Sequence, residues 1–312
     1  MNPYLVPGLE AGPEGPLCPF RRPEHERYYV PLDNTQQAFE QFQEQIGDLR
    51  GLRDEGRLIM VSGQRGCGKT ALINRCATWL RDGLDNLGIQ GMIFSLTQEG
   101  LENQPIQRRM NHVFQCVVDD LWQRELLSKE DHIRGLKERR DDLDLAYRYL
   151  SGVLDDDIVT IVLLPPSADL VREVEGYAKY ARKHIVFFVE SSFVDSMERS
   201  WPDICTASRV SPILLEVGPL RERDGWLFAQ ARQEHHPIAD EMFPRVSEKT
   251  MQRVTDGWET SVGQLQALLF GVYRERSNRP GPEITVTSDE VTYADITSYH
   301  FRLTRNRAGH IP

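Results

Sequence analysis

One ten-residue stretch, Val61–Thr70, constrains this chain more than any other. The phosphate-binding pattern G-x-x-x-x-G-K-[ST] is matched at every fixed position, by Gly63, Gly68, Lys69 and Thr70. The apolar run 57–62 before the loop predicts a buried strand, and the run 71–80 after it predicts a helix. Because the pattern needs a strand, a glycine loop and a helix in that order, we expect the chain to bind a nucleoside triphosphate.

The chemistry of phosphate explains these residue types. Glycines let the backbone curl so that several N–H groups converge on phosphate oxygens, and the helix that follows adds its positive N-terminal end. We expect Lys69 to reach the β- and γ-phosphates of ATP and the Thr70 hydroxyl to hold Mg²⁺. The predicted nucleotide contacts are Gly63, Gln64, Arg65, Gly66, Cys67, Gly68, Lys69, Thr70 and Ala71.

Composition narrows the class of protein. A chain of 312 residues suits one large domain or a core with a smaller one. Its net charge of −10 disfavours broad electrostatic binding to nucleic acid but leaves room for a local basic patch. Five scattered cysteines without a C-x-x-C pair indicate neither a zinc site nor a disulfide framework. The absence of a spanning stretch or of a signal-like N-terminus makes the cytoplasm the default location and predicts no membrane partner.

The strand pattern predicts the fold class. Five short apolar runs alternate with helical segments, at 57–62, 91–96, 157–164, 185–190 and 212–217. Nearly continuous apolar runs are typical of strands that are buried on both faces, as in parallel sheets. We therefore expect an α/β fold: a mostly parallel five-stranded sheet sandwiched by helices, followed by a smaller α-helical lid.

Composition also divides the chain into three expected parts: an irregular, proline-rich arm (1–35), a nucleotide-binding core (36–218), and a helical lid with a C-terminal helix and basic tail (219–312). Within the arm, the segment Pro19–Pro31 either wraps around the nucleotide base or packs along the surface of the core. Single helices are expected over about 34–53 and 131–153, and a last helix is expected to be capped by Ser288 with Glu290 in its first turn.

The order of elements resembles the AAA+ and STAND class of P-loop ATPases over residues 36–275. The junction Leu214–Leu220, followed by a helix, is similar to the passage in these families from the last core strand to the helical lid. No N-K-x-D motif is present, which argues against a GTPase. The resemblance implies ATP and Mg²⁺ as ligands, partner proteins, and a tendency to form homo-oligomers.

The chain departs from that class at two places. The third strand should end in acids that serve Mg²⁺ and the attacking water, but it ends Val162-Leu-Leu-Pro-Pro166. Either Glu190, at the end of the fourth strand, is the catalytic acid beside Lys69, or the acid has been lost; Asp169 is the nearest other acid. The lid has Ser261–Gln266 where many members place a sensor arginine, and Arg199 and Arg209 are the candidates for an arginine acting in trans.

Two functions follow. The leading hypothesis is a nucleotide-dependent switch or assembly factor acting on partner proteins, with weak or partner-dependent hydrolysis of ATP. The alternative is a DNA-directed AAA+ ATPase of the transposition or origin-loader type, which the final helix and its basic tail favour and the net acidity opposes. Whether ATP is hydrolysed or only bound stays open, because the acid of the third strand is missing.

Overall fold

The structure is a computed structural model that describes residues 2–9, 15–97, 104–127, 130–166, 170–221, 223–234, 244–277 and 290–308. Contacts divide the chain into two compact units. The first unit contains Met1–Gln37, Arg65–Ala71 and Val217–Pro312, and the second contains Ala38–Gln64 and Leu72–Glu216. This grouping follows contacts rather than chain order, so the division into an arm, a core and a lid at residues 35 and 218 stays a prediction.

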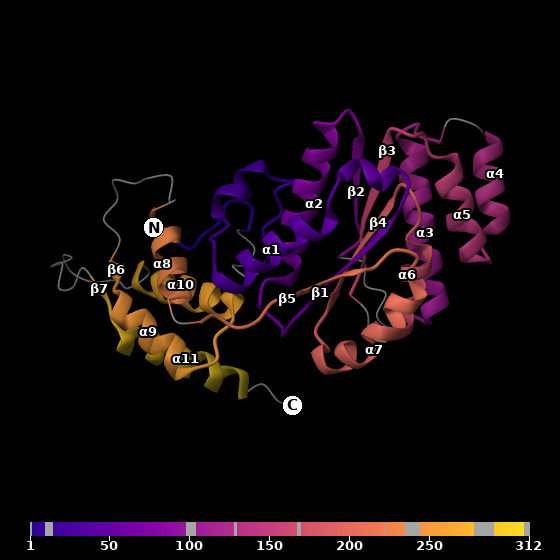
Figure 1. Ribbon diagram of the computed structural model, residues 1–312. Helices are drawn as coiled ribbons and strands as arrows, with labels where there is room; N and C mark the ends of the chain where they lie inside the picture. The colour runs from indigo at the N-terminus through magenta and orange to yellow at the C-terminus, as the bar shows by residue number, and fades with distance from the viewer. Residues whose placement is uncertain are drawn as a thin grey trace. The chain divides into compact units, whose positions relative to one another are not determined.

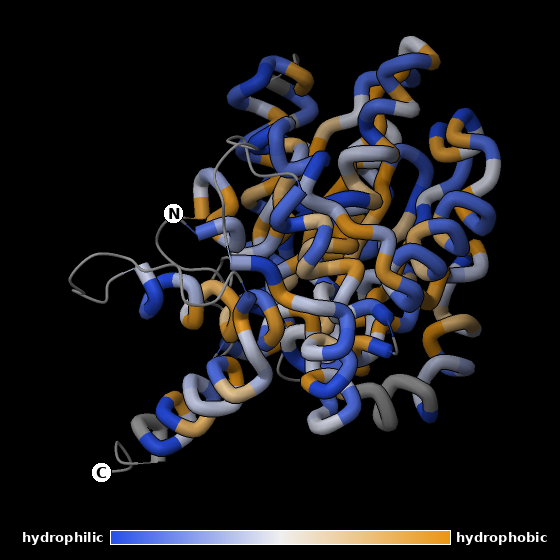
Figure 2. The backbone as a smooth tube through the Cα atoms, turned by 90° about the vertical axis from the view of Figure 1, so that its left-hand side faces the viewer, coloured by the Kyte–Doolittle hydropathy of each residue, from blue (hydrophilic) through white to orange (hydrophobic). Residues whose placement is uncertain are grey.

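The second unit is built on a five-stranded parallel sheet with the order β2-β3-β4-β1-β5 (Figure 1). Its strands are β1 (Arg57–Ser62), β2 (Gln90–Ser95), β3 (Ile158–Leu163), β4 (Ile185–Ser191) and β5 (Ile213–Glu216). These bounds lie within one residue of the predicted ones, and β1, β3 and β4 are almost entirely buried. The helical turns in Figure 2 carry both hydrophobic and hydrophilic residues, as expected for helices that bury one side. The predicted α/β class and parallel sheet are confirmed.

One face of the sheet carries the larger apolar cluster. Met60 of β1, Phe187 of β4 and Val162 of β3 are fully buried there, in contact with helices on that side. These helices are α3 (Ile106–Gln123), α5 (Leu143–Val153), α6 (Leu170–Tyr180) and α7 (Val194–Ala207). Because successive side chains of a strand point to opposite faces, Leu58 and Met60 lie on this face while Ile59 and Val61 lie on the other.

The opposite face is covered by helices from the beginning of the chain. Phe42 of α1 (Asp33–Ile46) lies 5.8 Å from the ring of Phe188 in β4 and 5.7 Å from the ring of Trp79 in α2 (Lys69–Asp85). The sheet is therefore sandwiched by helices, as the sequence predicts.

Two predicted helices differ from the observed ones, and one observed helix has no predicted counterpart. The helix expected over 34–53 ends at Ile46, because Gly47 has φ +67° and breaks it before a short 3-10 turn, Leu49–Arg53. The helix expected over 131–153 is two helices, α4 (Glu130–Arg139) and α5, and Asp142 caps the second of them. Helix α7 was not predicted.

The first unit contains a smaller, mainly helical core. Its elements are a 3-10 turn (Pro23–Tyr28), α8 (Asp224–Glu234), α9 (Glu248–Gly257), α10 (Val262–Ser277), α11 (Tyr293–Ala308), and the paired two-residue strands β6 (Arg245–Val246) and β7 (Glu290–Val291). Tyr4, from the arm, is fully buried among residues of α8 and α10.

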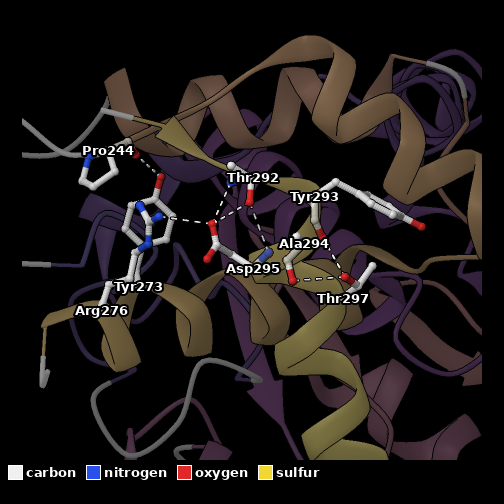
Figure 3. Close-up of polar contacts among 8 residues, drawn as sticks. All are labelled: Pro244, Tyr273, Arg276, Thr292, Tyr293, Ala294, Asp295 and Thr297. Atoms are coloured by element: carbon white, nitrogen blue, oxygen red, sulfur yellow. Dashed lines mark hydrogen bonds and ion pairs between the residues drawn. The ribbon is translucent and has the colours of Figure 1, made fainter. Parts of the chain in front are cut away.

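The start of the last helix corrects one expectation. Glu290 lies in β7 rather than in the first turn of a helix, and Ser288 lies outside the described residues. Helix α11 begins at Tyr293 instead. Thr292 and Asp295 cap it reciprocally: Asp295 accepts hydrogen bonds from the backbone and hydroxyl of Thr292, and the Asp295 N–H donates to that hydroxyl (Figure 3).

Among the helices that the structure describes, none combines the length and the apolar character needed to cross a membrane.

Candidate nucleotide site

The predicted phosphate loop lies between the last residue of β1, Ser62, and the first residue of α2, Lys69. Gly66 has φ +86° and Gly68 has φ +88°, values in the left-handed region that favours glycine. These two residues curl the backbone immediately before the first turn of α2. Lys69 is 6% exposed, so its buried stem is fixed at the start of that helix.

The second unit fixes the beginning of the loop. The Gly63 N–H donates a hydrogen bond of 3.1 Å to the carbonyl of Ser191, at the end of β4. Val61 lies opposite Glu190 in the same pairing, so the predicted acid is the penultimate residue of β4. Its partner Val61 lies two residues before Gly63, where the loop begins. Strand alternation places Glu190 on the face of Phe188, which is the face covered by α1 and α2. The register therefore places a carboxylate at the carboxyl edge of the sheet, where open α/β sheets bind ligands.

The end of β3 has no acid, as the sequence predicts. Leu163 and Leu164 are buried, and the proline pair follows directly. The guanidinium of Arg109 in α3 donates to the Pro166 carbonyl (3.1 Å) and to the Glu173 carboxylate (2.7 Å). This buried ion pair holds the turn after β3 in place, while Asp169 lies outside the described residues. Among the described strands, Glu190 near the end of β4 and Glu216 at the end of β5 flank the end of β1, and Glu190 is the one that the sequence predicts to act as the acid.

Within the first unit, the middle of the loop contacts the first turn of α10. The Gly263 N–H donates a hydrogen bond of 2.9 Å to the carbonyl of Gly66. A Cβ atom added to Gly66 would lie 2.5 Å from the Ser261 hydroxyl oxygen, and one added to Gly68 would lie 3.3 Å from Val262. The backbone of the loop therefore approaches α10 so closely that a side chain at Gly66 has no room.

Ser261 is itself held by a capping box. The Ser261 N–H donates to the side chain of Gln264 (2.9 Å), and the Gln264 N–H donates to the Ser261 hydroxyl (3.2 Å). The S-x-x-Q pattern at 261–264 predicts the start of a helix, but nothing in it predicts the contact between α10 and the loop. The side chain of Gln266, from the stretch without a sensor arginine, donates to the Tyr4 carbonyl.

The arm also contacts the loop segment. The Tyr29 hydroxyl donates to the carbonyl of Ala71 (2.7 Å), in the first turn of α2. Buried His25 fixes the arm's fold, because its ring nitrogens bond to the Cys18 N–H (2.9 Å) and the Pro7 carbonyl (2.8 Å). The arm is thus ordered next to the loop, and its contact with a nucleotide base stays a prediction.

The other predicted residues lie as follows. Cys67 is buried, which agrees with a space-filling role in the loop. Arg199, in α7, and Arg209, which follows α7, are exposed. Their role as an arginine acting in trans stays a prediction.

The residues present fit a nucleotide and Mg²⁺. Positive φ at two loop glycines, the absence of space for a side chain at Gly66, and a lysine and a threonine opening α2 are the features that the phosphate loop requires. The roles of Gly63–Ala71 and of Glu190 toward these ligands stay predictions.

No protein-family model matches the chain, and no curated protein sequence resembles it significantly. Solved structures do share its fold. The Orc1 protein of Aeropyrum pernix in complex with DNA is 11% identical, with a TM-score of 0.55 over 86% of this chain and 65% of the Orc1 chain. The Orc2 protein of Aeropyrum pernix, solved with ADPNP and ADP, is 12% identical, with a TM-score of 0.53 over 89% of this chain and 68% of that chain.

Cdc6p from Pyrobaculum aerophilum is 13% identical, with a TM-score of 0.52 over 89% of this chain and 70% of that chain. The chain thus spans only about two thirds of the length of these structures. At such low identity the likeness establishes the fold alone. Sheet order, phosphate loop and helical region agree with it, so the chain has the fold of the P-loop AAA+ ATPases.

Proposed function

We propose that this protein is a nucleotide-dependent, DNA-directed AAA+ ATPase of the initiator or loader type. The observation that carries the proposal is the likeness in fold to the Orc1, Orc2 and Cdc6p structures, one of them in complex with DNA and one with ADPNP and ADP. The phosphate loop between β1 and α2 supports the nucleotide half of the proposal.

The chain's own residues suggest how ATP would be held. The backbone N–H groups around Gly66 and Gly68 would receive phosphate oxygens, Lys69 would bind the β- and γ-phosphates, and Thr70 would hold Mg²⁺. When bound, Mg²⁺ neutralises charge on the phosphates. Glu190 would orient the attacking water and accept its proton. The ends of two neighbouring strands, β1 and β4, would then supply the site.

The hydrogen bond between Gly66 and Gly263 suggests how binding of a nucleotide to the loop would affect helix α10. A phosphate bound by the loop would change the position or the mobility of the segment that carries Gly66, and the first turn of α10 is hydrogen-bonded to that segment. A ligand shifts a conformational equilibrium only if it binds one of the two states more tightly than the other. We propose that the two states differ at this contact between the loop and α10.

Thermal unfolding tests the nucleotide half. A ligand at 100 times its Kd stabilises a protein by about 2.7 kcal/mol. We expect ATP with Mg²⁺ to raise the melting temperature of the full chain, and Lys69→Ala to abolish that rise. The matched control is Lys179→Ala, at an exposed lysine of α6. An undiminished rise in Lys69→Ala would refute the assignment of the loop.

Measurements of DNA binding test the second part of the proposal, the DNA-directed function. Fluorescence anisotropy with labelled duplex and single-stranded oligonucleotides, at about 50 mM salt and with ADP or the analogue ADPNP, should show binding whose Kd depends on the nucleotide. Equal, negligible binding under all four conditions would refute the DNA-directed function and leave the ATP-binding result standing.

A switch that acts on partner proteins is the second candidate. The net charge of −10 and the apolar end of β3 favour it, since the first opposes broad contact with DNA and the second favours slow hydrolysis. This candidate predicts stabilisation by ATP, little turnover, and no salt-dependent retention of DNA.

A further inference from the structure

An aromatic stack joins α9, the turn after it, and α11. The ring of Trp258 lies 4.7 Å from the ring of His300 at an interplanar angle of 18°, and 6.2 Å from that of Tyr293 at 22°. The guanidinium of Arg253 lies 4.2 Å from the centroid of Tyr293. Both contacts of Trp258 are therefore parallel stacks, and a cation covers the outermost tyrosine.

The stack continues along α11 into an exposed end. The His300 ring meets that of Phe301 edge-on, at 6.3 Å and 65°. Phe301 is 69% exposed, the largest value among the large hydrophobic side chains of the described residues. Exposed Arg305 lies four residues further on, so it neighbours Phe301 on the helix surface. We call these six residues the aromatic–arginine strip: Arg253, Trp258, Tyr293, His300, Phe301 and Arg305.

The fold of α11 does not require an exposed phenylalanine. Ile296 and Tyr299 provide the buried face of the helix. Its first turn is fixed by the Thr292–Asp295 cap and by an ion pair of 3.1 Å between Asp295 and Arg276 of α10 (Figure 3). The helix is thus anchored by residues other than Phe301, so packing and capping do not explain the exposed ring.

The charge around the strip differs from that of the whole protein. The chain carries a net charge of −10, yet residues 296–312 contain three arginines and no acid. Glu275 of α10 faces this part of α11 and is paired with Arg302. Within the described part of the chain, Arg305 has no ion-pair partner. The strip therefore offers a cation and exposed rings to an anionic partner.

We infer that the aromatic–arginine strip binds single-stranded DNA, an inference that rests on the proposed DNA-directed function. Bases stack on the exposed ring of Phe301 and pack beside the stacked rings of His300 and Trp258, while the guanidinium of Arg305 binds the backbone phosphates. Stacking of unpaired bases on aromatic rings together with arginines on phosphates is how proteins hold single strands without reading their sequence. A duplex keeps its bases stacked on each other and cannot use the rings in this way.

Anisotropy titrations of the full chain test the inference, with a labelled 20-nucleotide oligo(dT) and a 20-base-pair duplex as probes. We expect Phe301→Ala to weaken binding of oligo(dT) about tenfold, in line with the loss of one base stack, and Phe301→Tyr to retain it. Arg305→Ala should weaken it several-fold. The controls are Phe193→Ala, at a ring that is 55% exposed, and Arg134→Ala, at an exposed arginine of α4; neither should change the Kd.

The outcomes separate the two levels of the proposal. Binding of oligo(dT) by the wild-type chain with unchanged affinity in Phe301→Ala and Arg305→Ala would overturn the strip and leave the proposed function intact. Equal losses on the duplex would overturn the assignment to single strands. Absence of any DNA binding by the wild-type chain would overturn both the proposed function and the inference.

Discussion

At the scale of single residues, two glycines with similar backbones allow a matched comparison. Gly66 (φ +86°) and Gly47 (φ +67°) are both left-handed, so alanine at either position costs about 1–2 kcal/mol. Nothing lies within 4 Å of a Cβ at Gly47, whereas a Cβ at Gly66 meets the Ser261 hydroxyl. Moving that hydroxyl breaks the cap of α10, which is worth about 1 kcal/mol.

We therefore expect Gly66→Ala to lower the free energy of unfolding by about 1 kcal/mol more than Gly47→Ala, and to weaken ATP binding while the control does not. Urea denaturation and titration calorimetry measure the two effects. Equal destabilisation by both variants would contradict the close approach of the loop to α10.

Glu190 is the residue on which turnover is predicted to depend. It is the penultimate residue of β4, beside the strand that leads into the phosphate loop, while the end of β3 is apolar. Glu190→Gln keeps the size of the side chain but removes the base, so we expect ATP-induced stabilisation to persist and phosphate release to fall about 100-fold. Glu138→Gln, at an exposed acid of α4, is the control. Undiminished release would exclude Glu190 as the acid, and a wild-type chain without release would favour the binding-only alternative.

At the scale of elements, tyrosines between helices and sheet make stability depend on pH. Burial raises the pKa of Tyr147 in α5, and burial and then the charge of Tyr147 raise the pKa of Tyr177 in α6. Both hydroxyls lack a hydrogen-bond partner among the described residues. A raised pKa in the folded state means that these phenols stabilise the fold fully below pH about 10, the unfolded value, and that this stability is lost as the pH rises above it.

Tyr177→Phe removes one such phenol without breaking a hydrogen bond. We expect the free energy of unfolding of Tyr177→Phe to differ little from that of the wild type at pH 7. Above pH 10 it should fall with pH less steeply than in the wild type, by about 1.4 kcal/mol per pH unit. Urea denaturation between pH 8 and pH 11.5 measures the slope. Tyr149→Phe, at a half-buried ring, is the comparison, and an identical slope in wild type and Tyr177→Phe would contradict the prediction.

The elements differ in how far the sequence could predict them. The five strands were predictable because runs such as Ile158–Leu163 are apolar throughout. Helix α7 was missed because Pro202 and a polar composition interrupt its pattern, and the break at Gly47 was missed because apolar spacing continues through it to Leu52. The two-residue strands β6 and β7 are too short to leave a periodic signal.

The site shows the same limit. The phosphate loop was found because its fixed residues are adjacent in the sequence and serve one ligand. Its contact with Gly263 was not, because a hydrogen bond between backbone groups about two hundred residues apart leaves no residue type as a signal. For the aromatic–arginine strip, the sequence indicates only the basic tail that contains Arg305. The stacking of Trp258 on His300 depends on tertiary packing and leaves no signal in the sequence.

At the scale of the whole molecule, the balance of charge sets how the protein would hold DNA. A net charge of −10 repels a polyanion at long range, so attraction has to come from a small surface where rings and arginines act together. Arg253 and Arg305 are the strip's cations, and Arg302 lies beside them in an ion pair with Glu275. Binding is then predicted to depend less on salt than that of a basic protein.

The slope of log K against log[salt] measures this difference. Single strands give about −0.7 for each phosphate neutralised, so two or three arginines give a slope of about −1.4 to −2. Arg305→Ala should reduce its magnitude by about 0.7, while Phe301→Ala should lower the affinity and leave the slope unchanged, because a lost stack releases no counterions. Titrations with oligo(dT) between 50 and 300 mM salt measure these slopes. A wild-type slope of about −5 would mean broad electrostatic contact, which the strip cannot supply.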